Sequence, residues 1–349
     1  MIERTISTHL EHIQQQRRLL VEYCERLEAV LVPLESSTLQ DEVQRLKQRL
    51  QADTLTVLVL GEHNRGKSTV INALLGQRLL PAYPVPTTAL LSEVKWGAQP
   101  RLIVHTAPSG NGLLRQPQAV PLTELEHYLV INVDEEPSDE YERVELFWPL
   151  PPCFQDVVFI DSPALDEDER YLEATMCCLP SVDAVLFVLG CDFLPGKEET
   201  RVIERTKSAG HEAIFFLCNR VDLVDPHAQE RVKQRWLRHL SQLTSCGEQY
   251  IFFTNAKEAL AGRSIGNREQ LQHSNLLLVE EALYSFLAGC GHERVRRAAA
   301  ELQMLVHKAI QTCAEQEVPD SAGGARHLLV ALAEELHKFV IHLTGSFRS

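Results

Sequence analysis

The stretch that decides the fold of this chain reads Gly61-Glu62-His63-Asn64-Arg65-Gly66-Lys67-Ser68-Thr69. It follows the apolar run 55–60 and leads into the apolar run 70–76, so a buried strand, a glycine-bounded loop and a helix N-terminus follow one another. Glycine at both ends of the loop permits backbone angles and a close approach that a Cβ would obstruct. The loop amides and the helix dipole then direct positive charge toward a phosphate. The spacing G-x-x-x-x-G-K-[ST] predicts that the chain binds a nucleoside triphosphate.

The residues of this loop divide the work of holding the nucleotide. Lys67 can reach the β- and γ-phosphate oxygens, and the Ser68 hydroxyl can ligate Mg²⁺. An ordinary glycine turn is the alternative, but a strand before the loop and a helix after it make that alternative rare. The predicted nucleotide-binding residues of the loop are Gly61, Asn64, Arg65, Gly66, Lys67, Ser68 and Thr69.

The composition is that of a globular protein, with 349 residues, 44% hydrophobic and 23% charged. A net charge of −14 argues against nonspecific binding to nucleic acid or to anionic lipid. No apolar run approaches a membrane span and the N-terminus has no signal-peptide core, which predicts a cytoplasmic location. The nine cysteines have no CxxC spacing and are expected to be free buried thiols, with a disulfide of Cys24 or Cys313 as the alternative.

Helical periodicity occupies both ends of the chain. Apolar residues recur every three or four positions before Pro33, again in 39–50, and after Gly289 over 295–313 and 328–343. One helix from the start and two from the end are expected to bury their apolar stripes on each other as a three-helix bundle. The predicted organisation is therefore N-terminal helices in 1–52, a nucleotide domain in 53–289 and C-terminal helices in 290–349, the last two joined by a linker at 319–324.

Short apolar runs alternate with helical segments in the middle of the chain, as expected for strands covered on both faces. Such alternation after the P-loop predicts an α/β fold with a doubly wound, mostly parallel sheet, which binds its ligand at the carboxyl ends of the strands. The predicted strands are 55–60, 90–96, 102–105, 157–160, 184–189, 214–217 and 250–253.

Two motifs downstream of the loop are suited to Mg²⁺ and the γ-phosphate. In Pro86-Thr87-Thr88-Ala89 the second threonine is the preferred metal ligand and catalytic contact. In Asp161-Ser162-Pro163-Ala164, Asp161 follows a buried strand and can hold the metal shell through water; a helix cap is its alternative role. The usual D-x-x-G pattern ends in glycine, so Ala164 keeps the amide but loses access to positive φ, which affects γ-phosphate sensing.

The base is read by two motifs at later strand ends. Asn219-Arg220-Val221-Asp222 is a variant of the [NT]-K-x-D pattern of GTPases, in which Asp222 accepts hydrogen bonds from guanine and would repel adenine. Arg220 stands in the place of the lysine, and its guanidinium can also stack on the base. Asn255-Ala256-Lys257 ends the last predicted strand, where a backbone amide usually meets guanine O6. Together these motifs indicate GTP and GDP as the nucleotides.

The set of motifs 61–69, 86–89, 161–163 and 219–222 resembles the dynamin superfamily, especially bacterial dynamin-like proteins, over about residues 53–289. The resemblance implies a GTPase that is activated when two copies dimerise through the nucleotide face, with the loop at 192–199 near the second copy. It also implies that the flanking helices form a bundle signalling element, whose movement is coupled to hydrolysis.

The resemblance also assigns roles within the phosphate loop. His63 occupies the position that orients the attacking water, usually a glutamine, and Asn64 the position that helps hold a monovalent cation (K⁺ or Na⁺) or, in some relatives, an arginine finger. Arg65 lies one place too late for that finger and is expected to face solvent or the second copy.

One part of the family pattern is missing from this sequence. Dynamin-like proteins carry a helical stalk and a lipid-binding tip between the last two bundle helices, where this chain has only 319–324. A natural loss of the stalk and an engineered junction are both open, and contact with membrane is expected only through the absent part, in a longer parent at the membrane periphery.

Three functions follow from these observations. The preferred one is a self-activating GTPase that remodels membrane in a longer parent. The rival is a nucleotide-gated scaffold with negligible hydrolysis, because Ala164 and His63 weaken the site. A ribosome-associated GTPase similar to Era is disfavoured by the acidic charge balance and the lack of a basic RNA-binding domain.

Overall fold

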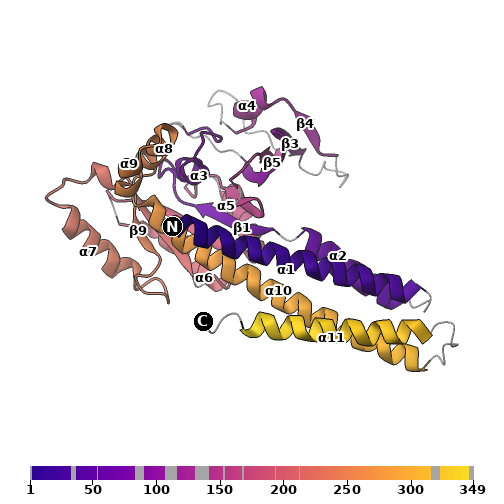
Figure 1. Cartoon of the computed structure of the whole chain (residues 1–349). Helices are drawn as coiled ribbons and strands as arrows, with labels where there is room; N and C mark the ends of the chain where they lie inside the picture. Colours follow the sequence, from indigo (N-terminus) through magenta and orange to yellow (C-terminus); the bar gives the residue numbers. More distant parts are fainter. Residues whose placement is uncertain are drawn as a thin grey trace. The chain divides into compact units, whose positions relative to one another are not determined.

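The computed structural model describes residues 2–32, 37–52, 54–82, 90–106, 116–129, 141–151, 154–166, 169–192, 194–211, 213–315 and 323–345. The chain divides into two compact units, one made of Thr54–Leu287 and one made of Met1–Asp53 with Ala288–Ser349. Figure 1 labels the elements of both units. We call them the nucleotide unit and the helical unit.

The nucleotide unit is an α/β structure around one sheet. Its strands are β1 (Leu55–Leu60), β2 (Leu91–Trp96), β3 (Arg101–Thr106), β4 (Gln118–Val120), β5 (Tyr141–Trp148), β6 (Val157–Asp161), β7 (Ala184–Gly190), β8 (Ile214–Asn219) and β9 (Ile251–Phe253). Its α-helices are α3 (Lys67–Leu75), α4 (Leu125–Leu129), α5 (Glu169–Cys178), α6 (Lys197–Ser208), α7 (Gln229–Leu240), α8 (Ala256–Ile265) and α9 (Arg268–His273), with short 3₁₀ turns at η2 (Leu122–Glu124), η4 (Leu179–Ser181) and η5 (Val221–Leu223).

The nine described strands form one sheet in the order β4-β3-β5-β2-β6-β1-β7-β8-β9. β6, β1, β7, β8 and β9 run parallel, so their carboxyl ends meet at the same edge. On the far side of β6 the pairing is mixed: β2 pairs antiparallel with β6 and parallel with β5, and β3 pairs antiparallel with β5 and β4. The predicted α/β fold with a doubly wound, mostly parallel sheet is confirmed, as are the seven predicted strands.

The sequence prediction missed β4 and β5. β5 alternates charged residues with the buried Val144 and Leu146, and its neighbours β2 and β3 show the same alternation of buried and partly exposed residues. An alternating strand of this kind has no continuous apolar run, so a search for such runs passes over it.

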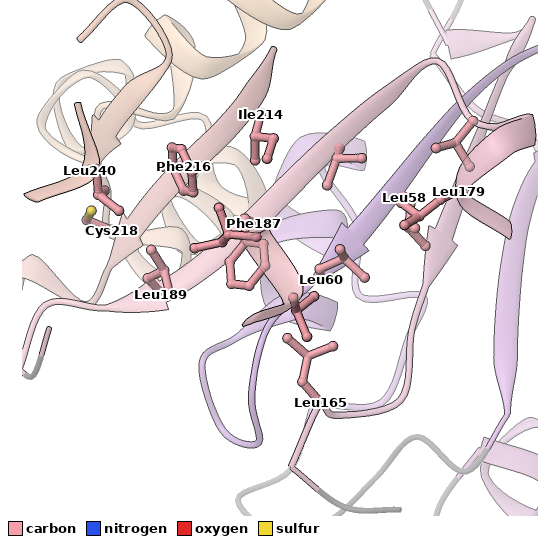
Figure 2. Close-up of a cluster of buried hydrophobic side chains, with 14 of the residues drawn as sticks. Leu58, Leu60, Leu165, Leu179, Phe187, Leu189, Ile214, Phe216, Cys218 and Leu240 are labelled. Carbon is pink, nitrogen blue, oxygen red and sulfur yellow. The ribbon is translucent and has the colours of Figure 1, made fainter. Parts of the chain in front are cut away.

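The core of the nucleotide unit is built from the central strands, which are buried along their whole length. The rings of Phe187 on β7 and Phe216 on β8 lie 6.2 Å apart, and Figure 2 shows them with Leu58 and Leu60 of β1 and Leu240 of α7 in one apolar cluster. This layer of side chains fixes the strand ends that follow it, and the nucleotide motifs within the described residues begin at the ends of β1, β6, β8 and β9.

The helical unit contains α1 (Ile2–Leu31), α2 (Ser37–Ala52), α11 (Gly323–Gly345) and the part of α10 (Leu276–Glu315) from Ala288 onward. One buried cluster joins all four, including Leu27, Leu46, Leu302 and Leu336. The predicted helical bundle is confirmed, but the expectation of three helices was wrong, because α2 also buries its apolar stripe in the same core. Figure 1 shows the four labelled helices.

Two further expectations about the helices can be compared with the structure. The predicted return to helix after Gly289 was wrong in its position, because α10 runs unbroken through Gly289 and Gly291. A Cβ at Gly289 would meet nothing within 4 Å, so no close packing requires glycine there. The linker 319–324 lies mostly outside the described residues.

The described cysteines are free thiols, Cys24 and Cys313 among them. Among the helices that the structure describes, none combines the length and the apolar character that a membrane span requires.

Candidate functional site

A cavity of about 850 Å³ opens at the carboxyl edge of the parallel strands. The motif residues that line it are His63, Asn64, Gly66, Lys67, Ser68, Thr69, Ala164, Asn219, Arg220, Asp222, Asn255 and Lys257. Residues more than 150 positions apart in the sequence thus reach one site, because β1 and β8 end at the same edge of the sheet. Gly61, Arg65, Ala256 and Asp161 are not among the lining residues, and each has a different place described below.

Gly61 and Gly66 fix the path of the loop between β1 and α3. Gly61 has φ 153°, and a Cβ there would lie 2.4 Å from the Val188 carbonyl oxygen. Gly66 has φ 97° and caps the start of α3 in the left-handed region, where a Cβ would lie 2.6 Å from Asn219 Nδ2. Both positions therefore exclude any other residue on space alone, and the second also on backbone conformation.

Lys67 is the first residue of α3 and is only 7% exposed. Its Nζ donates to the carbonyl oxygens of Gly61, at 2.9 Å, and of Glu62, at 3.1 Å. These bonds hold the ammonium group inside the curve of the loop, at the N-terminus of a helix. The arrangement concentrates positive charge where the amides of the loop converge, as an anion site requires.

Ser68 and Asp161 form the second part of the site. Ser68 Oγ donates to Asp161 Oδ2 at 2.6 Å, and Asp161 is 1% exposed. Burial raises the pKa of Asp161 to about 6, against the opposing effects of the Lys67 charge and the Ser68 hydrogen bond. Its other oxygen, Oδ1, is buried and has no hydrogen-bond partner. A hydroxyl beside an unsatisfied carboxylate oxygen is the hard oxygen environment that Mg²⁺ prefers, so these residues fit that ion.

Asn219 joins the two motif loops. Its Nδ2 donates to the Arg65 carbonyl oxygen at 3.0 Å, and its Oδ1 accepts from the Ala256 amide at 3.0 Å. The side chain is 3% exposed. A single buried amide thus connects the phosphate loop, the end of β8 and the start of α8. The motif is expected to present a backbone amide to guanine O6, and of its amides that of Ala256 is bonded to Asn219 instead.

Arg220 and Asp222 lie at the mouth of the cavity. Arg220 has a left-handed backbone, φ 63°, and its Nη2 donates to Asn64 Oδ1 at 2.6 Å. Asn64 also has positive φ, 57°. The side-chain oxygen expected to help hold a monovalent cation therefore already accepts a bond from a guanidinium group. Asp222 is exposed at the first turn of η5, where it can reach a bound base.

In the motif Asn255-Ala256-Lys257 the first residue has a structural role. Asn255 is the N-cap of α8, and its Oδ1 accepts from the Glu258 amide at 3.1 Å. Such a cap satisfies one of the free amides at a helix start. Lys257 is exposed and lines the cavity. Of this motif, Asn255 and Lys257 reach the site, while Ala256 is buried behind it.

His63 and Ala164 occupy the part of the cavity near the phosphate loop. The His63 amide donates to Asp166 Oδ1 at 2.7 Å, which ties the loop to the chain after β6. Outside glycine, the described residues with positive φ are Asn64, Arg220 and Asn275. Ala164 is not among them, so it occupies its place in this structure without the strain that would call for glycine.

Arg65 is mostly buried, so it is not the solvated side chain that was one of its two expected placements; a place facing the second copy stays a prediction. Its side chain is 19% exposed and forms ion pairs with Glu62 at 2.6 Å, Glu199 at 3.4 Å and Asp192 at 3.7 Å. Sequence analysis missed these partners, because two of them lie more than 120 positions away. The only signal was the acidic character of 192–199.

Two parts of the predicted site need separate mention. Thr88 and the rest of 83–89 lie outside the described residues. The cavity is also lined by residues that no motif indicated, among them Arg78, Leu122, Thr123 and Glu126. They come from the segment after α3 and from η2 and α4, which carry no recognisable nucleotide pattern.

Comparison with known proteins places these features in a family. The family model described as the Dynamin family matches residues 57–221, the stretch from β1 to the start of η5. An uncharacterized protein of Caldicellulosiruptor sp. (strain Rt8B.4) is 25% identical over 266 residues, which is 76% of this chain and 64% of that protein. The bacterial dynamin-like protein of Nostoc punctiforme is 25% identical over 299 residues, covering 78% of this chain and 42% of that one.

A solved chain from an oligomerised bacterial dynamin pair has the same fold, with a TM-score of 0.62 at 16% identity. The match covers 95% of this chain and 51% of that chain. This chain therefore spans less than two thirds of the length of each of these relatives. The phosphate loop, Asp161 and the β8 motif all lie inside the region that matches the Dynamin family model, so the nucleotide unit is similar to dynamin-family proteins in sequence and in fold.

Proposed function

We propose that this chain binds GTP together with Mg²⁺ and hydrolyses the bond between its β- and γ-phosphates. The observation that carries the proposal is the meeting of Lys67, Ser68 and Asp161 at the carboxyl edge of the sheet. A buried ammonium group, a hydroxyl and an unsatisfied carboxylate oxygen are the set that a metal-bound triphosphate needs. The family supports a guanine nucleotide in general.

Guanine preference is assigned to Asp222. Its carboxylate is exposed at the mouth of the cavity and can accept two hydrogen bonds from the edge of guanine. Adenine presents an acceptor at N1, so the same carboxylate would repel it. Arg220 would cover the base, and Asn219 would hold both recognition loops at the correct separation.

The chemistry we propose is positioning and neutralisation of charge. Lys67 and the amides of the loop would stabilise the charge that develops on the phosphates. Ser68 and Thr88 would hold Mg²⁺ directly and Asp161 through water, while His63 would orient the attacking water. Little covalent work is required of the protein in such a reaction, so the geometry of the loop sets the rate.

Self-association is the proposed means of activation. We propose that GTP brings two copies together through the nucleotide face. Residues 1–52 and 290–349 would then act as a bundle signalling element that moves with hydrolysis. A similar solved chain belongs to an oligomerised bacterial dynamin pair that senses and tethers membranes, which supports membrane work in a longer parent. We place this chain in the cytoplasm and propose no nucleic acid partner.

A nucleotide-gated scaffold with negligible hydrolysis is the second candidate. Two observations favour it. Ala164 lines the cavity in a backbone conformation without positive φ, and histidine replaces the usual glutamine at position 63. In this candidate GTP binding and the association of two copies remain, but the attacking water is poorly held.

Two substitutions with matched controls test the nucleotide site. Lys67→Ala should abolish GTP binding measured by calorimetry, whereas Lys197→Ala, at the exposed start of α6, should not. Asp222→Asn should shift preference from GTP to xanthosine triphosphate, whereas Asp225→Asn, three residues later, should leave it unchanged. Unaltered GTP affinity in Lys67→Ala would rule out the proposed site.

A further inference from the structure

The contacts of the Arg65 side chain are not accounted for by the proposed nucleotide site. Arg65 does not line the cavity, and its guanidinium group is surrounded by the carboxylates of Glu62, Asp192 and Glu199. Asp192 lies between β7 and α6, and Glu199 lies in the first turn of α6. The side chain of Arg65 thus joins the loop that would hold the phosphates to α6.

Glu199 is the buried member of this group. Its side chain is 1% exposed, against 47% for Asp192 and 20% for Glu62. It lies in the first turn of α6, and its Oε2 accepts from the Gly196 amide, the N-cap, at 3.0 Å. Its Oε1 faces Arg65 Nε at 3.4 Å. Burial raises the pKa of Glu199, and the Gly196 amide and Arg65 charge oppose that rise.

The contact is built closely into the backbone. A Cβ at Gly190, the last residue of β7, would lie 3.0 Å from Arg65 Nη1 and 2.5 Å from Asp192 Oδ1. Glycine at this position therefore leaves the room that the guanidinium group occupies. On its other side, the Arg65 carbonyl oxygen accepts from Asn219 Nδ2 at 3.0 Å. Arg65 is held by its backbone toward β8 and by its side chain toward α6.

A buried carboxylate that loses its cationic partner raises the free energy of the folded state, because its charge is no longer compensated. It must take up a proton or move until water reaches it, and either change displaces the turn in which it lies. Here that turn is the start of α6, and the same displacement would release Arg65 and the loop around it. The position of α6 and the shape of the phosphate loop are therefore linked.

We propose that Arg65 is a positioning residue that couples the phosphate loop to residues 190–192 and 194–199 through its pair with Glu199. Nucleotide binding and the position of this segment then depend on each other, and the coupling is reciprocal. The part of the proposal that concerns nucleotide rests on the proposed function, whereas the coupling between loop and segment does not.

The test uses Arg65→Met, Glu199→Gln and the double variant in the whole chain. In Arg65→Met an uncompensated carboxylate remains buried, so GTP affinity should fall about tenfold. Glu199→Gln should have a smaller effect, because Arg65 keeps Glu62 and Asp192. The double variant has no buried ion left and should return to within about threefold of the wild type.

Hydrogen exchange of the nucleotide-free protein supplies a second readout. Arg65→Met should raise amide exchange in both 61–66 and 194–199, and the double variant should lower it again in both. The matched control is Arg205 with Glu173, an exposed pair on the far end of α6, 2.9 Å apart. Arg205→Met and Glu173→Gln should change neither GTP affinity nor exchange in these two segments.

The outcomes separate the coupling from the nucleotide proposal. If exchange in 194–199 does not respond to Arg65→Met, or if the double variant is as weak as Arg65→Met, the coupling is overturned. If amide exchange responds as expected but neither the wild type nor any variant binds GTP, the coupling stands and the proposed function fails.

Discussion

Ser68 Oγ donates a hydrogen bond of 2.6 Å to Asp161 Oδ2, and this bond joins the first turn of α3 to the end of β6. The two residues are 93 positions apart and both are buried. Parallel pairing of β1 with β6, in which Val59 lies opposite Asp161, produces the contact. The sheet register therefore places the two oxygen groups that we assign to Mg²⁺.

Substitution of Asp161 tests this assignment. Asp161→Asn removes the charge that would hold the water shell of the ion but keeps the size of the side chain and an acceptor for Ser68. We expect a much higher Mg²⁺ concentration for half-maximal GTP turnover, with GTP affinity in EDTA nearly unchanged. A metal titration of phosphate release measures the first quantity and calorimetry the second. An unchanged Mg²⁺ requirement would contradict the assignment.

Gly66 tests the shape of the loop separately from backbone strain. Gly66→Ala and Gly210→Ala both place a Cβ on a residue with φ near 100°, 97° and 99° respectively, so both should lose about 1–2 kcal/mol of stability. At Gly66 the Cβ would also lie 2.6 Å from Asn219 Nδ2, whereas at Gly210 nothing lies within 4 Å. Thermal unfolding should show backbone strain in both variants and a larger loss in Gly66→Ala, because its Cβ also meets Asn219, and GTP titration should show loss of binding only in Gly66→Ala. Equal GTP affinity in the two variants would contradict the proposed loop.

Much of this site follows from sequence, because strand-loop-helix order and motif spacing are local properties. The spacing of Gly61 to Thr69 predicts a glycine-bounded turn between a strand and a helix, and the buried runs before Asp161 and Asn219 place those residues at strand ends. The helical unit was predictable for the same reason, since apolar periodicity marks a buried helix face.

The remaining features depend on which distant elements become neighbours. The partners of Arg65 and the bond from Arg220 to Asn64 are set by strand order, which no local pattern encodes. The part of the cavity wall from η2 and α4 likewise carries no motif. The apolar periodicity of α2 is visible in the sequence. The helices against which that face packs are set by the tertiary fold, so the pattern alone does not place α2 in the bundle.

Arg263 offers a stability prediction away from the nucleotide. Its Nη1 donates to the Leu74 carbonyl oxygen at 2.8 Å near the end of α3, and its Nη2 pairs with Glu280, which is 8% exposed on α10. Arg263→Ala leaves a buried carboxylate and a free carbonyl, so we expect a loss of about 3 kcal/mol. Urea unfolding measures the loss. Arg205→Ala, which breaks an exposed pair, should cost at most about 1 kcal/mol; equal losses in the two variants would contradict this account.

The lowered pKa of Glu293 leads us to expect that the stability of the helical unit depends on pH. Hydrogen bonds from Arg296 and Arg297 lower the pKa of Glu293 to about 2. A carboxyl with a lower pKa in the folded state contributes stability above its unfolded pKa, and this contribution is lost as the pH falls toward 2. Glu293→Gln should therefore melt at a lower temperature than the wild type at pH 6, and the difference should shrink toward pH 2. Because the pairs are exposed, high salt should also reduce it. A difference that does not change with pH would contradict the assignment.

The measurement that tests the central claim most directly is release of phosphate from GTP at several protein concentrations, with Mg²⁺ and with either K⁺ or Na⁺. We expect turnover per molecule to rise with protein concentration, because a second copy completes the site. Turnover near zero at every concentration, with tight GTP binding, would contradict a self-activating GTPase and favour the nucleotide-gated scaffold.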